Sequence, residues 1–134
     1  MINQFARASL TATIIVLVLA EAAKGQSALS PVGVWRGTSL CLVKPSPCHD
    51  EVVVYRITPM KTPDSVSFDA FKIVNGQEED MGTLSCRVRS GGAQLTCAIP
   101  RGTWRFNIRG DSLTGDLVRA DGSKFRDVRT ARSK

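Results

Sequence analysis

The chain has 134 residues, which is enough for one domain and excludes a two-domain enzyme. It is 43% hydrophobic and 22% charged, a globular composition that argues against a disordered chain or a polytopic membrane protein. Lys plus Arg is 18 and Asp plus Glu is 12, a formal net charge of +6, and the single His leaves little scope for His-dependent catalysis.

The N-terminal residues have the pattern of an export signal. Arg7 precedes an uncharged run at 8–20, whose 13 residues suit a signal peptide but fall short of the roughly 20 that a membrane-spanning helix needs. Small residues at Ala20 and Ala22 then favour cleavage. We predict a signal peptide over residues 1–23, a flexible arm over 24–32 and no transmembrane segment in the mature chain. The expected location is the periplasm or the extracellular medium; an uncleaved membrane anchor is the alternative.

The rest of the chain predicts strands and no helix. Apolar segments of strand length are separated by turn residues, and the turn pairs Asn75-Gly76 and Asp121-Gly122 are strong hairpin signals. The predicted strands are Val34–Val43, Glu51–Thr58, Val66–Val74, Met81–Arg89, Ala93–Ile99, Thr103–Arg109, Ser112–Arg119 and Lys124–Thr130.

Several of these segments alternate between apolar and polar residues. Trp104, Phe106 and Ile108 share one face of their strand, for example, while Arg105 and Asn107 share the other. This period is typical of an antiparallel sheet with one buried side. We predict a single all-β domain over residues 33–134, an eight-stranded antiparallel up-and-down barrel, because closure removes exposed edge strands. An open sandwich is the structural alternative.

The four cysteines predict two disulfides in an exported domain of this size. Counting outward from Gly91 places Cys86 directly opposite Cys97 in a hairpin, within reach of a disulfide. Cys41 and Cys48 then pair across the first loop. Zinc binding is disfavoured because the chain has no CxxC spacing and one His.

Gly33-Val34-Trp35 at the start of the first strand resembles the Gly-x-Trp motif of lipocalins and their calycin relatives. In those families the Trp closes one end of the barrel and an Arg from the last strand packs across it. The resemblance implies that role for Trp35 and for either Arg126 or Arg129. The chain departs from the pattern because it has no Thr-Asp-Tyr-like motif and no helix after the last strand. The group also includes small secreted protease inhibitors.

Large apolar residues dominate the predicted inner faces, which favours a filled core. The predicted inward set comprises Trp35, Tyr55, Ile57, Ile73, Leu84, Leu95, Ile99, Trp104, Phe106, Ile108, Leu113, Leu117 and Phe125. The small inward residues Gly37, Ser39 and Gly115 leave room for a shallow apolar pocket at one mouth. We predict that Trp35, Gly37, Ser39 and Tyr55 line this pocket.

Charge is uneven along the chain, since residues 85–134 carry 11 basic and 4 acidic side chains. The predicted outward arginines form a candidate basic stripe that would attract an anionic envelope component; they are Arg87, Arg89, Arg105, Arg109 and Arg119. Nucleic acid is an unlikely partner, because the aromatic residues beside these arginines are predicted to be buried and unable to stack on bases. An ordinary solvated surface is the alternative.

No motif indicates an enzyme. Cys48-His49-Asp50-Glu51 is the one local cluster of polar chemistry, and it lacks a nucleophile or a placed pocket. We expect no catalytic residue, no metal and no cofactor. The leading hypothesis is an exported binding protein for a small apolar ligand or an anionic envelope component. The alternative is a secreted protein-binding inhibitor that docks through its loops or through residues 24–32.

Overall fold

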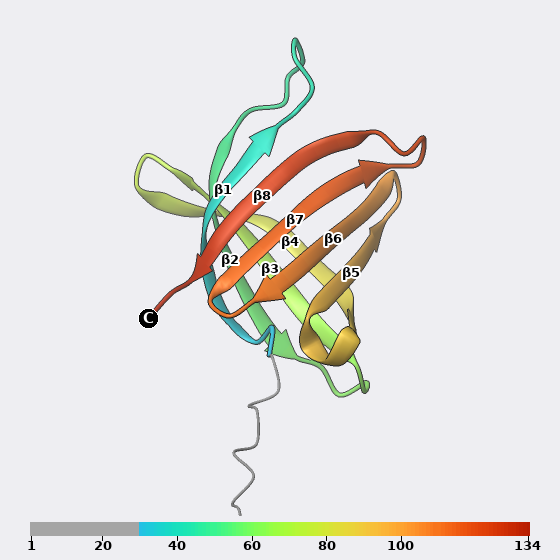
Figure 1. The fold of residues 1–134 in the computed structure, drawn as a ribbon. Coiled ribbons are helices and arrows are strands. Elements are labelled where there is room, and N and C mark those ends of the chain that lie inside the picture. The colour runs from blue at the N-terminus through green and yellow to red at the C-terminus, as the bar shows by residue number, and fades with distance from the viewer. Residues whose placement is uncertain (1–29) are drawn as a thin grey trace, which may run out of the picture.

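The structure, a computed structural model, describes residues 30–134 (Figure 1). Eight strands follow one another in chain order, with a single short 3-10 turn, η1, at Ser90–Gly92. The strands are β1 (Gly33–Cys41), β2 (Glu51–Pro59), β3 (Ser65–Val74), β4 (Gln77–Arg89), β5 (Gln94–Ile99), β6 (Gly102–Arg109), β7 (Ser112–Arg119) and β8 (Lys124–Arg132). The predicted signal peptide and residues 24–29 of the predicted arm lie outside the described residues.

Each strand pairs antiparallel with the next, and β1 pairs with β8, so the sheet closes into a barrel. The closing ladder extends from Trp35 opposite Arg132 to Cys41 opposite Arg126. Closure confirms the predicted eight-stranded up-and-down barrel and excludes the sandwich. None of the helices within the described residues is long and apolar enough to cross a membrane.

Both predicted disulfides are present, Cys41–Cys48 and Cys86–Cys97. Cys86 and Cys97 are buried inside the barrel, whereas the first pair ties off the loop between β1 and β2. Such bonds restrict the unfolded chain and contribute roughly 2.5–3 kcal/mol each in the chain-entropy model.

The barrel has a closed end, at which the chain enters β1 and leaves β8. Trp35 is fully buried there, and its indole Nε1 donates a hydrogen bond to the Pro31 carbonyl at 2.9 Å. The guanidinium of Arg132 lies 4.2 Å from the centroid of the Trp35 ring. The Trp-and-Arg closure implied by the resemblance is therefore formed, but the arginine is Arg132 and not Arg126 or Arg129.

Residues at the end of the predicted flexible arm are held against this closed end. Arg132 donates hydrogen bonds from Nη1 to the Val32 carbonyl at 2.8 Å and from Nη2 to the Ser30 carbonyl at 2.9 Å. Pro31 is buried. Residues 30–32 therefore extend the barrel's packing, while 24–29 lie outside the described residues.

The core fills the barrel from the closed end to its middle. It comprises Trp35, Val53, Tyr55, Ile57, Val66, Phe68, Cys86, Leu95, Cys97, Phe106, Ile108, Leu113 and Val128. Of the predicted inward set, Leu84 and Trp104 are partly buried and pack against this core. Four others lie outside it: Ile73, Ile99, Leu117 and Phe125. The alternation in β8 turns Val128 inward, and Phe125 instead lies under the guanidinium of Arg119, 4.5 Å away.

The β3–β4 hairpin contains an irregularity that changes the course of its tip. The register shifts between Ala70 and Phe71, and Met81 is the extra residue on β4. Gly82 beside it has φ 107°, a conformation that favours glycine. On β3, ordinary alternation points Phe68 inward and places Phe71, three residues further on, on the outer face, where it lies under the guanidinium of Arg56, 4.8 Å away.

Candidate functional site

The other end of the barrel, here called the cavity end, carries the loops that follow β1, β3, β5 and β7 (Figure 1). A cavity of about 360 Å³ opens there. This volume lies within the range of roughly 300–1,000 Å³ that is usual for small-molecule sites. The barrel is therefore filled near its closed end and hollow near its cavity end.

One wall of the cavity is apolar and comes from β3 to β6. Its side chains are Phe68, Ala70, Leu84, Ile99, Trp104 and Phe106. The rings of this wall lie in contact, with centroids 4.8 Å apart for Phe68 and Phe106 and 5.6 Å apart for Trp104 and Phe106. An aromatic surface of this kind offers apolar contact to a ligand.

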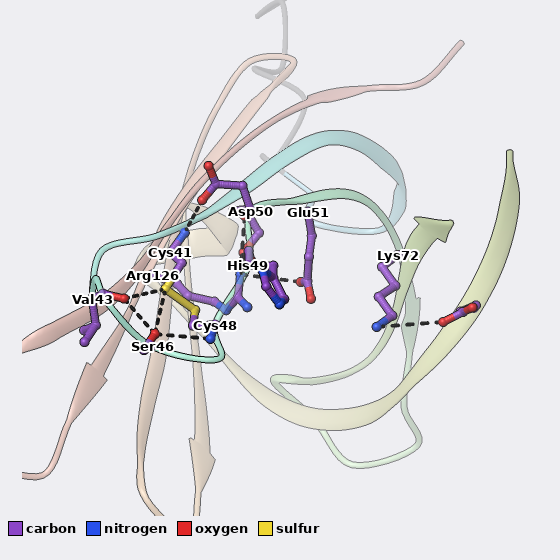
Figure 2. Close-up of polar contacts among 11 residues, drawn as sticks. Cys41, Val43, Ser46, Cys48, His49, Asp50, Glu51, Lys72 and Arg126 are labelled. Atoms are coloured by element: carbon purple, nitrogen blue, oxygen red, sulfur yellow. Dashed lines mark hydrogen bonds and ion pairs between the residues drawn. A yellow bond between two sulfur atoms is a disulfide. The ribbon is translucent and has the colours of Figure 1, made fainter. Parts of the chain in front are cut away.

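The opposite wall is polar and comes from β8, β1 and β2. Ser39, Glu51, Tyr55 and Arg126 provide it. Nη1 of Arg126 donates to the Ser39 hydroxyl at 3.2 Å and to the His49 carbonyl at 3.1 Å, and it lies 3.5 Å from Oε2 of Glu51 (Figure 2). The ion pair is largely buried, because the Arg126 and Glu51 side chains are only 13% and 20% exposed.

Tyr55 presents a protonated hydroxyl to the cavity. Burial raises the pKa of Tyr55 far above its usual value, and the nearby carboxylate of Glu51 raises it further. Hydrogen bonding with Ser39 and the charge of Arg126 act in the opposite direction but are weaker. At neutral pH the phenol is therefore a hydrogen-bond donor, not a phenolate.

The cavity also reaches the side of the barrel, between β4 and β5. These strands pair only from Arg87 opposite Thr96 to Arg89 opposite Gln94, and the ladder ends where the Cys86–Cys97 disulfide begins. Beyond that point, the 81–83 segment of β4 lines the cavity and is exposed. The short ladder thus widens the opening on this side.

The structure brings two of the four predicted pocket residues to the cavity. Ser39 and Tyr55 line it, whereas Trp35 is part of the closed end. Gly37 does not provide space, because a Cβ there would meet the β8 backbone at the Arg129 carbonyl. A side chain likewise occupies the space expected at Gly115, where a Cβ would meet the Phe106 ring.

Sequence reasoning missed the pairing of Arg126 with Glu51. Glu51 belongs to the polar cluster at 48–51, and the other members of that cluster serve the fold. Asp50 Oδ1 accepts a hydrogen bond from the Cys41 backbone N–H at 2.8 Å, and Cys48 is in a disulfide (Figure 2). Inward alternation in β8 was the signal that could have identified Arg126 as a cavity residue.

The predicted basic stripe is exposed but interrupted. Arg105 lies 3.1 Å from Asp116, and Arg119 covers the Phe125 ring. Thr96 separates Arg87 from Arg105 across the sheet. The remaining members, Arg89 and Arg109, are exposed as well.

The residues described by the structure bring together no group of three metal-ligating side chains. Neither a family model nor a curated protein sequence matches the chain. The geometry of the cavity therefore carries the functional argument.

Proposed function

We propose that this protein binds a small, mainly apolar ligand inside the cavity end of the barrel. The single observation that carries the proposal is the cavity itself, with an aromatic wall on β3 to β6 facing a polar wall on β8, β1 and β2. Apolar sites with a few placed polar groups are the usual form of small-molecule sites, because burial supplies affinity and the polar groups fix orientation.

Two features support a wider assignment to exported calycin-type binding proteins. The barrel has one end closed by Trp35 under Arg132 and one hollow end. Its two disulfides fit an oxidising compartment, as the signal-like sequence at 1–23 predicts. We therefore also propose that the protein is exported and that it belongs to the calycin group.

The outer arginines support no second function, because Asp116 lies beside Arg105 and Thr96 separates Arg87 from Arg105 across the sheet. The inhibitor hypothesis gains no specific support either. Its proposed arm ends in residues 30–32, which are bonded to the barrel by Arg132.

A fluorescent probe tests the proposal. N-phenyl-1-naphthylamine is apolar and uncharged, and its emission rises when it leaves water. We expect saturable binding to the chain beginning at residue 24, with quenching of Trp104, which lines the cavity.

Two matched variants locate the binding. Ala70→Leu adds bulk to the cavity wall, whereas Ala98→Leu makes the same change at an exposed position on β5. We expect Ala70→Leu to weaken probe binding and Ala98→Leu to leave it unchanged, with Leu84→Phe as a second variant that fills the cavity. Absence of saturable binding, or equal effects of the two alanine variants, would refute the proposal.

A further inference from the structure

The cavity is lined by two charged residues of opposite sign, Arg126 and Glu51, which lie 3.5 Å apart. The net charge of the lining is therefore zero. Arg126 and Glu51 compensate each other's charge before a ligand binds. The interaction between the two charges is stronger than in water, because the site is partly shielded from solvent.

Two lysines near the mouth are paired too. Lys72 Nζ lies 3.8 Å from Glu79 Oε2 (Figure 2). Lys44 Nζ lies 3.9 Å from Asp50 Oδ2. The fields that these lysines would exert on an anionic ligand are therefore already offset by carboxylates.

The polar wall still has hydrogen-bonding capacity. Every contact of the Arg126 guanidinium described above uses Nη1, and within residues 30–134 Nε and Nη2 have no hydrogen-bond partner. Tyr55 adds a hydroxyl, and Glu51 adds a carboxylate that can accept. The wall thus offers donors and an acceptor together.

These features favour an uncharged polar head group over a carboxylate. A carboxylate head could accept from Arg126 and Tyr55, but it would lie near the carboxylate of Glu51 and lose its hydration. A hydroxyl or primary amide both donates and accepts, so it can satisfy both sides of the wall without adding a charge.

We propose that the cavity selects uncharged amphiphiles, aliphatic alcohols or primary amides with one head group of this kind, over the corresponding fatty carboxylates. The inference rests on the proposed function and deepens it. Glu51 is the residue that excludes the anion, and Arg126 is the residue that holds the neutral head.

Competition between two ligands of equal chain length tests this selection. n-Decanol and decanoate are titrated at pH 7 against bound N-phenyl-1-naphthylamine. Because decanol leaves water more readily than decanoate in any case, the informative quantity is the ratio of the two affinities and its change between variants.

Glu51→Gln removes the opposing charge and keeps the size of the side chain. We expect it to shift the affinity ratio toward decanoate by about tenfold, the order expected for like charges several ångströms apart near a protein surface. Arg126→Gln should shift the ratio in the opposite direction, which keeps the test valid if one variant fails to fold. Asp64→Asn removes an exposed carboxylate from the loop between β2 and β3, away from the cavity lining, and should change neither affinity.

Two outcomes would overturn the inference alone. One is wild-type protein that binds decanoate as tightly as decanol, because Arg126 would then be acting as an anion anchor. The other is an affinity ratio that neither Glu51→Gln nor Arg126→Gln changes. If the probe itself does not bind, the proposed function fails and this inference fails with it.

Discussion

Replacing Arg132 by alanine should destabilise the barrel substantially. The lost interactions are a cation–π contact at 4.2 Å, hydrogen bonds to two backbone carbonyls at 2.8 and 2.9 Å, and an ion pair with the exposed Asp111 that contributes little. A contact of this kind contributes about 1 kcal/mol when it is partly exposed. The two hydrogen bonds, discounted because the side chain is 30% exposed, add roughly 0.5–1 kcal/mol each. We therefore expect a loss of about 2–3 kcal/mol in the free energy of unfolding.

Arg129→Ala is the matched control on the same strand. Arg129 is 77% exposed and forms an ion pair with Asp127, two residues away, so its removal should cost no more than about 0.5 kcal/mol. Urea unfolding of both variants, followed by circular dichroism with the disulfides intact, measures the difference. Equal losses for the two variants, or a loss below about 1 kcal/mol for Arg132→Ala, would refute the assignment of Arg132 as the closing residue.

Three further measurements test other parts of the fold. Replacing both Cys86 and Cys97 by alanine should lower the unfolding free energy by about 3 kcal/mol in a urea titration, since the bond restrains the unfolded chain and its sulfurs fill the core. Gly37→Ala should cost more than about 2 kcal/mol, because its Cβ would meet the β8 backbone; wild-type stability would contradict this close approach. Hydrogen bonds from Arg56 lower the pKa of the Glu78 carboxyl, so this pair contributes stability above the unfolded pKa and loses it as pH falls through the folded pKa. Arg56→Gln should raise that pKa in an NMR titration, and an unchanged pKa would contradict the contact.

Strands and disulfides followed from local patterns. The period of two that places Leu95 and Cys97 on one face also fixes their partners across a hairpin, and Val88 does lie opposite Leu95. The predicted strand boundaries are inaccurate where the apolar–polar alternation weakens. Residues 77–80 at the start of β4 are polar on both faces, so no alternation marked them as strand.

The position of the closing arginine depended on contacts distant in the sequence. Arg129 lies on the outer face of β8, since its neighbours Val128 and Thr130 are buried on the inner face. The alternation of faces along β8 does not distinguish Arg126 from Arg132, because both lie on the inner face. The choice was made by Ser30 and Val32, whose carbonyls accept hydrogen bonds from Arg132. The pairing of Trp35 with Arg132 carries β8 beyond its predicted end at Thr130.

The cavity was predictable in kind but not in position, because its walls come from opposite sides of the barrel. Small residues were taken as the sign of a pocket, yet strand approach and the Phe106 ring occupy the space at Gly37 and Gly115. The cavity instead occurs where the β4–β5 ladder ends. Strand length and closure set that location, and neither leaves a signature in the residues that line it.

The two inward arginines of β8 show how one pattern produces two roles. Arg132 donates hydrogen bonds from Nη1 and Nη2 to backbone carbonyls and stacks its guanidinium on the Trp35 ring. Its side chain therefore has a structural role. Arg126 uses Nη1 alone and faces a hollow instead of an indole. Its guanidinium keeps free hydrogen-bond donors, and the carboxylate of Glu51 beside it cancels its charge. Arg126 is therefore suited to bind an uncharged polar head group. The difference in role follows from what each end of the barrel places against the same side chain.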